Sequence, residues 1–513
     1  MKHFNTAGPC RPEDHYMLPA AARLPEMREL VDQKAYFVLH APRQIGKTTV
    51  MMELARELTA EGRYLAVMLS MEAGSAFKHQ PERAERRILR EWRRLIGFRV
   101  PAELQIPPWP RDVQTVGEAL WYLASNSPRP FVVFLDEIDS LEDESLIAVL
   151  RQLRSGYPDR PRDFPWSLAL IGMRDVCDYK VASGGSERLD TASPFNILTR
   201  SLTLENFTAA EVATLYRQHT AETGQVFSDE AARRAFELTE GQPYLANALA
   251  KVAVEELQPD KAQPITLAEI ERAKQILIER QETHLDSLVK RLREPRIRNI
   301  IEPILAGKSL SDLPADDLRF ALDLGLVRQS NGGGIVIANP VYREVIPHML
   351  AFVTRASLPQ IAPTWLKPDG RIDFERLLEA FLKFWRQHGQ PLLKSVHYHE
   401  IAPHIVLMAF MDRVVNGGGH LEREYAIGTR RMDVLLTYGA DRLAMELKVW
   451  RDGESDPLGE GLEQLDHYLS GLGLETGWLV IFDQRSGLPD ISQRTTAEKA
   501  RTPAGREVVV IRA

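Results

Sequence analysis

Short apolar runs alternate with amphipathic stretches over the first 207 residues. The apolar runs have the length of buried strands and lie at 36–40, 64–69, 131–135, 167–171 and 202–204. The stretches between them follow the period of a helix, and the first extends to about Glu61. Such alternation predicts a mostly parallel sheet with helices on both faces. We therefore expect an α/β core over residues 1–207.

The pattern changes after this core. Residues 208–283 are largely helical, with a break at Gly241-Gln242-Pro243. Residues 284–355 begin helical and end in two short apolar runs around a glycine-rich turn, which favours a winged-helix-like domain. A proline-rich stretch at 356–373 is typical of a linker. The remaining segment, 374–513, is expected to form a further α/β domain, so the chain is predicted to be multidomain.

Composition narrows the class of protein. The 513 residues carry 64 Lys and Arg against 71 Asp and Glu, and the net charge of −7 argues against a protein that coats nucleic acid by bulk attraction. Two cysteines, Cys10 and Cys177, form neither a disulfide framework nor a zinc motif, which favours a reducing, cytoplasmic location. No apolar run approaches the ~20 residues of a membrane-spanning helix. We expect no membrane partner.

A phosphate-binding motif follows the first predicted strand. The segment 41–48, A-P-R-Q-I-G-K-T, leads from that strand into a helix, although Ala41 replaces the first glycine of the P-loop pattern. In this pattern backbone N–H groups cradle phosphates, the lysine reaches the β- and γ-phosphates, and the threonine hydroxyl binds Mg²⁺. The predicted nucleotide contacts are Arg43, Gln44, Ile45, Gly46, Lys47, Thr48 and Thr49.

A second strand ends in two acids. In F-V-V-F-L-D-E, Asp136 is placed to hold Mg²⁺ through a water, and Glu137 to polarise the attacking water. Either motif alone could be merely a Gly-Lys turn or an acidic strand end. The two motifs together, both at strand ends and in this order, predict binding of ATP and Mg²⁺. Arg174, three residues beyond the fourth strand, is a candidate contact of the γ-phosphate, and a surface arginine paired with Asp175 is the alternative.

Four segments together resemble one group of P-loop ATPases. These are A-P-R-Q-I-G-K-T, F-L-D-E-I-D-S-L, I-G-M-R-D at 171–175 and T-E-G-Q-P-Y-L at 239–245. They are similar to the AAA-like or STAND group, including the so-called archaeal ATPases. The resemblance covers about residues 1–350 and implies a helical lid, a winged helix and an ATP-driven switch in which Pro243 follows nucleotide state. It also places Tyr16 near the adenine, with a plain ordered arm as the alternative.

A basic cluster precedes the predicted wing. It comprises Lys290, Arg291, Arg293, Arg296 and Arg298. Winged helices often bind DNA through such residues. Acids dilute the cluster, however, and a solvated helix face or an internal packing domain is the alternative.

The C-terminal segment contains a predicted β-hairpin. Two strand-like runs flank Gly439-Ala440, a loop typical of a type II′ turn. If Tyr438 pairs with Asp441, one face of the hairpin becomes apolar. The cross-strand pairs on this apolar face are Met432 with Leu447, Val434 with Met445, and Leu436 with Leu443. The other face then carries Asp433 opposite Glu446 and Arg431 opposite Lys448.

Two opposed carboxylates repel unless a cation lies between them. Oxygen ligands favour Mg²⁺ or Mn²⁺, so Asp433 and Glu446 are predicted metal ligands. Lys448 lies on the same face and could orient or deprotonate a water beside the metal. These groups suit phosphodiester hydrolysis. The alternative is a solvent-facing hairpin with ion pairs Asp433–Arg431 and Glu446–Lys448.

The spacing D-x12-E-L-K after G-T-R-R-M-D resembles the PD-(D/E)xK nuclease superfamily over about 390–490. The resemblance implies a restriction-endonuclease-like fold and a catalytic set of Asp433, Glu446 and Lys448. The resemblance also implies two further site residues: Gln464 on the following helix, and Glu400 as the acidic residue that precedes the core strands. His397, His399, His404 and His420 near Glu400 fit no closed zinc site.

The sequence as a whole suggests an ATP-regulated, Mg²⁺-dependent DNA nuclease, and by resemblance a role in bacterial defence against phage or plasmids. One alternative is a regulatory ATPase of the STAND type that binds DNA or a protein without cutting. Another is an ATP-dependent repair or mobile-element factor. A homo-oligomer is compatible with the sequence but not indicated by it.

Overall fold

A computed structural model describes most of the chain. The described residues are 1–19, 23–173, 197–280, 291–306, 310, 313–330, 332–358, 363–395, 398, 401–415, 418–427 and 430–513. The chain divides into two compact units, and each is described by itself. The first comprises Met1–Glu279 with Ala315–Asn331, and the second comprises Arg280–Pro314 with Gly332–Ala513.

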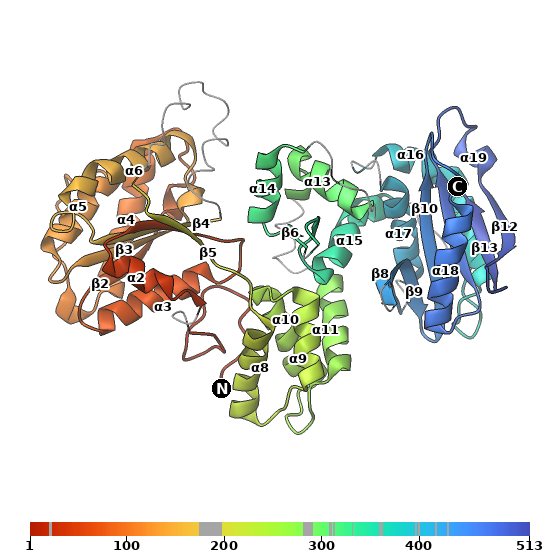
Figure 1. Ribbon diagram of the computed structural model, residues 1–513, viewed down its shortest axis with the longest axis horizontal. Coiled ribbons are helices and arrows are strands. Elements are labelled where there is room, and N and C mark those ends of the chain that lie inside the picture. Colours follow the sequence, from red (N-terminus) through yellow and green to blue (C-terminus); the bar gives the residue numbers. More distant parts are fainter. Residues whose placement is uncertain are drawn as a thin grey trace. The chain divides into compact units, whose positions relative to one another are not determined.

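The first unit is built on a five-stranded parallel sheet in the order β2-β3-β4-β1-β5. Its strands are β1 (Tyr36–His40), β2 (Leu65–Ser70), β3 (Phe131–Asp136), β4 (Ser167–Gly172) and β5 (Arg200–Thr203). Helices cover both faces, as predicted (Figure 1). They are α2 (Glu26–Asp32) and α3 (Lys47–Ala60) on one face, and α4 (Pro81–Arg99), α5 (Val116–Asn126) and α6 (Asp143–Gly156) on the other.

The apolar runs form central strands because both faces of the sheet are buried. Along β1, Tyr36 and Val38 pack into the core beneath α4, α5 and α6. Phe37 and Leu39 point the other way, into the core with α2 and α3. This continuous burial explains why these strands appear in the sequence as unbroken apolar runs.

A helical region follows the sheet. It contains α8 (Ala209–Thr223), α9 (Asp229–Thr239), α10 (Pro243–Val252), a π-helical turn (Ala253–Leu257) and α11 (Leu267–Arg280). The predicted break falls between α9 and α10, where Gly241 has φ +70°. A Cβ at Gly241 would lie 1.8 Å from the carbonyl oxygen of Phe207, so only glycine allows this close approach.

The segment predicted as winged-helix-like contains helices and two short strands. These are α13 (Pro295–Leu305), α14 (Ala315–Asp323), β6 (Val327–Gln329), β7 (Ile335–Ile337) and α15 (Pro340–Ser357). The division into compact units passes through this segment, with α14 and β6 in the first unit and the rest in the second. The winged-helix assignment stays a prediction.

The second unit contains a six-stranded mixed sheet in the order β12-β13-β11-β10-β9-β8. Its strands are β8 (Gly419–Ile427), β9 (Arg430–Tyr438), β10 (Asp441–Trp450), β11 (Gly477–Asp483), β12 (Thr496–Arg501) and β13 (Glu507–Arg512). Its helices are α16 (Phe374–Ser395), α17 (Ala402–Val415), α18 (Leu458–Leu472) and the short α19 (Ile491–Arg494). Helix α18 covers one face, and α16 and α17 lie on the other (Figure 1).

The predicted linker over 356–373 is wrong for its second half. Residues 363–373 are part of the second unit: Trp365 and Ile372 are each 2% exposed, and Leu366 forms a β-bridge with Ile372. Arg371 forms an ion pair with Asp441, whose carboxylate also accepts the Ile372 N–H at 3.0 Å. The prolines and glycine in this stretch interrupt regular structure, but they do not separate it from the core.

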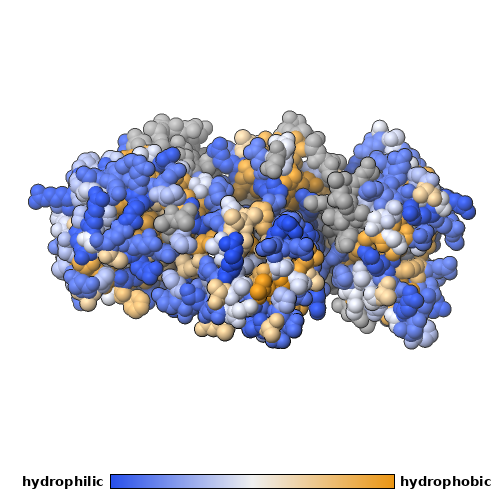
Figure 2. Space-filling view, turned by 60° about the horizontal axis from the view of Figure 1, so that its bottom comes forward, coloured by the Kyte–Doolittle hydropathy of each residue, from blue (hydrophilic) through white to orange (hydrophobic). Residues whose placement is uncertain are grey.

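The face of the molecule in Figure 2 is largely hydrophilic, with apolar side chains in small patches. Over the described ranges, no helix combines the length and the hydrophobicity that crossing a membrane requires.

Candidate functional sites

The P-loop joins β1 to α3. Gly46 caps the helix with φ +98°, and Gln44 is also left-handed at φ +60°. Such turns direct successive backbone N–H groups into one concave, anion-binding surface. Ala41 is not among the described residues with positive φ, so its position needs no glycine. Its N–H donates to the carbonyl of Gly172 at 3.3 Å, which holds the loop against the end of β4.

Lys47 is folded back onto its own loop. Its Nζ donates to the carbonyl oxygens of Ala41 at 2.7 Å and Pro42 at 2.8 Å. Burial lowers the pKa of Lys47 to about 8, although the carboxylates of Asp139 and Asp136 oppose the shift. A phosphate is a better partner for this cation than a neutral carbonyl, so the lysine is ready to exchange these contacts for an anion.

The two nucleotide motifs meet at Thr48 and Asp136. The Thr48 hydroxyl donates to Oδ2 of Asp136 at 2.8 Å, across 88 residues of sequence. Asp136 is 5% exposed; burial raises its pKa, and the Thr48 hydrogen bond works against that shift. A hydroxyl beside a carboxylate is the ligand pair that the P-loop pattern requires for Mg²⁺. The observed contact therefore fits the predicted metal position.

Glu137 follows Asp136 in a left-handed conformation, φ +56°. Desolvation raises its pKa to about 7, with further contributions from the carboxylates of Glu72 and Asp136. Glu72 was not identified from the sequence, because its approach depends on the pairing of Ser70 with Asp136. A carboxyl group that titrates near neutrality is suited to accept a proton from water.

A cavity of about 120 Å³ opens beside the P-loop. The N-terminal arm lines it together with Ile45 and with Pro243 and Tyr244 of the helical region. Tyr16, the candidate adenine contact, is buried and donates its hydroxyl to Glu222 at 2.8 Å. The arm is tied to the P-loop helix where the Cys10 N–H donates to the Thr49 hydroxyl at 3.0 Å. Tyr16 thus both lines the cavity and anchors an ordered arm.

Two predicted site residues cannot be located. Arg174, the candidate γ-phosphate contact, and Glu400, the candidate upstream acid, both lie outside the described residues.

The predicted register of the C-terminal hairpin is confirmed. Strands β9 and β10 pair antiparallel with Asp441 opposite Tyr438 and Met445 opposite Val434. Gly439 has φ +59° and Ala440 is not among the positive-φ residues, the combination of a type II′ turn. Continuing the register by one residue places Asp433 opposite Glu446. The apolar face is buried at Val434, Leu436, Leu443, Met445 and Leu447.

Asp433 and Glu446 lie on the face covered by α18. Oδ2 of Asp433 accepts the Leu447 N–H at 2.8 Å. Glu446 is 2% exposed, and its Oε2 has no hydrogen-bond partner. Burial and the neighbouring Asp433 raise the pKa of Glu446 to about 9, against the opposing effect of Lys448. A buried carboxyl group opposite a second carboxylate is costly to ionise unless cations compensate the charge.

Lys448 connects this pair to helix α18. Its Nζ lies 3.2 Å from Oε1 of Glu446 and donates to Oε1 of Gln464 at 2.5 Å. Glu460, which was not identified from the sequence, lies 3.4 Å from the same Nζ and accepts from the Gln464 amide at 2.8 Å. Glu460 and Gln464 are four residues apart on one helix face, and this spacing could have revealed Glu460.

The hairpin residues fit a hard divalent ion. The buried, unpartnered Oε2 of Glu446 is a free ligand position beside Asp433. Mg²⁺ commonly binds through one or two carboxylates and keeps several waters. Over the described ranges, no group of three or more His, Cys, Asp or Glu could hold a metal. An ion here would therefore depend on two carboxylates, a backbone carbonyl and water.

The described part of the basic cluster at 291–298 is partly neutralised. Glu294 forms ion pairs with Arg291 at 2.7 Å and with Arg296 at 2.9 Å. These contacts fit the alternative of a structural helix end better than an open DNA-binding surface.

Comparison with solved structures gives loose similarities only. A Walker-type ATPase of Pyrococcus abyssi is 15% identical, with a TM-score of 0.49 over 66% of this chain and 98% of that chain. The RuvB Holliday junction branch migration motor of Thermotoga maritima is 17% identical, with 0.35 over 63% and 92%. Cdc6p of Pyrobaculum aerophilum is 11% identical, with 0.36 over 67% and 96%.

Sequence comparison identifies the first part of the chain. No curated protein matches. The profile of the AAA-like domain matches residues 16–346, which include the P-loop, Asp136 and the helical region but end before the hairpin. This match covers more than half of the chain, and the P-loop geometry agrees with it. The protein therefore belongs to the AAA-like family of P-loop ATPases.

Proposed function

We propose that the protein is an ATP-driven switch that controls a Mg²⁺-dependent DNA nuclease. The observation that carries the proposal is the convergence of Asp433, Glu446, Lys448 and Gln464 on one face of the second sheet. Membership of the AAA-like family supports the ATPase part.

At the P-loop, Lys47 would bind the β- and γ-phosphates once it leaves the carbonyls of its own loop. Thr48 and Asp136 would hold Mg²⁺ between them, and their 2.8 Å contact brings the two groups to one position. Glu137 would orient and deprotonate the attacking water, for which its raised pKa is suitable. ATP is thus the proposed cofactor of the first unit.

At the hairpin, Asp433, Glu446 and the Leu447 carbonyl would hold Mg²⁺, with Mn²⁺ as a substitute. When bound, the ion supplies a Lewis acid for the phosphate oxygens and lowers the pKa of a bound water. Lys448 is within reach of that position and would orient the water as a protonated amine, because its neighbours raise its pKa, while Gln464 holds the lysine in place. Glu400, from the resemblance alone, stays a proposed assisting acid.

Control by nucleotide is part of the proposal because an ungated nuclease would endanger its host's genome. The helical region, through Pro243, borders the cavity next to the P-loop and is the proposed element that follows nucleotide state. A cytoplasmic role in defence against phage or plasmids is proposed from the resemblance of the two motifs to such fusions. Plaquing tests with wild type, Lys47→Ala and Asp433→Ala separate this role from repair or mobile-element transfer, because equal plaquing on all three contradicts defence.

The nuclease is tested by incubating supercoiled plasmid with Mg²⁺. Wild type should nick the DNA, and Asp433→Ala should lower the rate by at least about 100-fold, because a metal ligand is lost. Asp466→Asn is a matched control: Asp466 is also on the α18 side of the sheet but pairs with Arg506 at 2.8 Å. Equal cleavage by wild type and Asp433→Ala would contradict the site assignment.

One observation favours a second function. Lys448 is already engaged by Glu446, Glu460 and Gln464, as a purely structural cluster would be. On this account the second unit binds DNA or a protein without cutting, and the chain is a regulatory ATPase. DNA binding without cleavage in Mg²⁺ and in Mn²⁺ would support this alternative.

A further inference from the structure

A cationic and aromatic cluster lies beside the proposed nuclease site. Trp450 follows Lys448 by two residues on β10, so the two side chains leave the strand on the same face. Arg485 follows β11, and Arg512 is the last residue of β13. Strands β10, β11 and β13 are parallel. The cluster therefore stands at the carboxyl ends of parallel strands, where α/β proteins commonly bind ligands.

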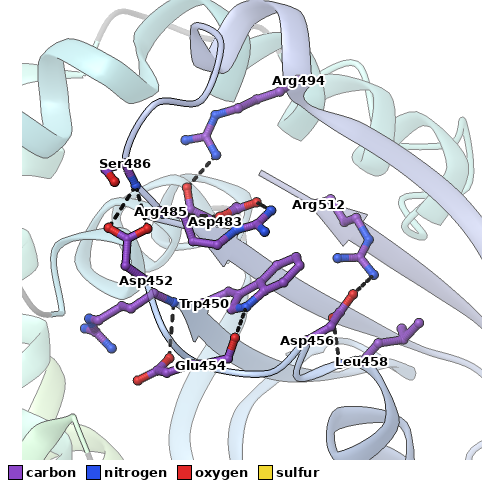
Figure 3. Close-up of polar contacts among 11 residues, drawn as sticks. Trp450, Asp452, Glu454, Asp456, Leu458, Asp483, Arg485, Ser486, Arg494 and Arg512 are labelled. Atoms are coloured by element: carbon purple, nitrogen blue, oxygen red, sulfur yellow. Dashed lines mark hydrogen bonds and ion pairs between the residues drawn. The ribbon is translucent and has the colours of Figure 1, made fainter.

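Trp450 and Arg485 form the centre of this cluster. The guanidinium carbon of Arg485 lies 3.4 Å from the centre of the indole, and that of Arg512 lies 5.7 Å away. Figure 3 shows both guanidinium groups beside the indole. Asp483 holds Arg485 through two oxygens at 2.9 and 2.7 Å. Arg485 is thus fixed in position, yet its side chain remains 33% exposed.

Arg512 pairs with a more exposed carboxylate than Arg485 does. It donates to Oδ2 of Asp456 at 2.7 Å, and Asp456 belongs to the loop between β10 and α18. The other oxygen of Asp456 accepts the Leu458 N–H at 3.0 Å, at the start of α18. Arg512 is 28% exposed and Asp456 is 37% exposed, so this ion pair is open to competition from solvent and ligands.

The position of Arg512 relates it to the metal site. In the paired register, Lys448 aligns with Ile481 on β11, and Ile481 aligns with Arg512 on β13. Lys448 and Arg512 thus belong to one row across the sheet, two strands apart, or about 10 Å between backbones. The separation between neighbouring phosphates of a DNA strand is of the same order. Arginine beside an aromatic ring is a common means of binding phosphates and bases of nucleic acids.

We propose that Trp450, Arg485 and Arg512 form a subsite that binds a phosphate of the DNA strand next to the bond cleaved at the hairpin site. In the protein without DNA, the Asp456 carboxylate occupies the place of that phosphate on Arg512. The DNA phosphate replaces Asp456 when the strand binds, and Asp456 keeps its contact with the start of α18. This inference rests on the proposed nuclease function, whose substrate contacts it specifies.

The test measures binding of a fluorescein-labelled DNA duplex to the full-length protein by fluorescence anisotropy, with Ca²⁺ in place of Mg²⁺. Arg512→Ala should weaken binding about fivefold to tenfold at 0.1 M salt, and should reduce the slope of log K against log salt by about 0.9. Asp456→Asn should tighten binding about threefold, because it removes the competing charge while the asparagine oxygen can still accept the Leu458 N–H.

The matched controls are Arg506→Ala and Asp466→Asn. These residues form an ion pair of similar length, 2.8 Å against 2.7 Å for Arg512 and Asp456, but Arg506 precedes β13 while Arg512 ends it. Both controls should leave the affinity within about twofold of wild type. Equal losses in Arg512→Ala and Arg506→Ala, weaker binding by Asp456→Asn, or no binding by wild type would each overturn the subsite.

The two proposals can fail separately. Plasmid nicking that depends on Asp433, combined with unchanged binding by Arg512→Ala, overturns the subsite and leaves the nuclease standing. Absence of nicking, combined with the opposite effects of Arg512→Ala and Asp456→Asn on binding, supports a DNA-binding surface and overturns the nuclease.

Discussion

The P-loop site and the hairpin site assemble similar groups by different means. At the P-loop, Thr48 and Asp136 come from separate strand-and-loop units, 88 residues apart, and meet because β4 pairs with both β1 and β3. At the hairpin, Asp433 reaches the Leu447 N–H across 14 residues, through one tight turn and a pairing register. The first arrangement depends on the fold of a domain, and the second depends on local pairing.

The lysines of the two sites, Lys47 and Lys448, differ in the groups that they contact and in the direction of their pKa shifts. Lys47 lies against neutral carbonyls, and burial lowers its pKa to about 8. For Lys448, burial also favours the neutral form, but Glu446 and Asp433 outweigh it and raise the pKa. Lys47 thus contacts neutral carbonyl oxygens, whereas Lys448 contacts a buried carboxyl group. This contrast suggests that each site can be disabled alone.

The largest expected effects are on ligand binding. Lys47→Ala should weaken ATP binding by about 100-fold, equivalent to about 2.7 kcal/mol, because the loop loses its only proposed lysine contact with the phosphates. Asp433→Ala should leave ATP binding within about twofold of wild type. Titration with a fluorescent ATP analogue measures both. Weaker ATP binding by Asp433→Ala would show that the two sites are not separable.

A backbone change in the helical region should have an effect of similar size on stability. Gly241→Ala should destabilise the first unit by about 3 kcal/mol, because the new Cβ collides with the Phe207 carbonyl and the left-handed backbone is strained. Gly224→Ala is the control, since Gly224 has φ +79° but a Cβ at this position would meet no atom within 4 Å. It should cost about 1 kcal/mol. Urea unfolding measures both, and equal effects would contradict the close contact.

Glu446→Gln should separate stability from function at the hairpin. In EDTA the variant should be more stable than wild type by about 1–2 kcal/mol, because glutamine avoids the cost of burying an ionisable carboxyl group opposite Asp433, a cost that the raised pKa of Glu446 reflects. It should also lose the stabilisation that Mg²⁺ gives to wild type. Thermal unfolding with and without Mg²⁺ measures this. The control is Glu498→Gln, at an exposed position of β12, which should leave the free energy of unfolding nearly unchanged. If Glu446→Gln is less stable than wild type in EDTA, the buried carboxyl group does not carry the proposed cost.

The smallest effect concerns pH and the N-terminal arm. Burial lowers the pKa of His219 below 6.5, and Lys261 adds to the shift, while the Gln225 hydrogen bond and Glu222 oppose it. The unfolded chain therefore binds more protons than the folded one below about pH 6.5, so His219 makes stability fall as pH decreases through that value. His219→Gln should flatten the pH dependence of the free energy of unfolding between pH 7 and 5. An unchanged profile would contradict this role.

Local patterns allowed much of this structure to be predicted. The strand at 131–135 was predicted from its apolar run and is observed as Phe131–Asp136. The hairpin register was predicted because a tight turn and an apolar face fix the pairing. In both cases residues close in sequence determine the outcome.

Other features depend on long-range packing. Glu72 approaches Glu137 only because β2 pairs with β3, and Tyr16 reaches Glu222 only because the arm packs on α8. Trp365 was assigned to a linker, since proline and glycine mark breaks in regular structure but do not show whether the chain docks on a core. Glu460 is different, because its four-residue spacing from Gln464 was available in the sequence.

Control of the nuclease by ATP is tested most directly by the rate of plasmid nicking with Mg²⁺, measured with and without ATP, in wild type and in Lys47→Ala. If the P-loop unit controls the nuclease, ATP should change the rate of wild type several-fold, and the rate of Lys47→Ala should be insensitive to ATP. Wild-type cleavage at one rate with and without ATP would contradict the proposed control.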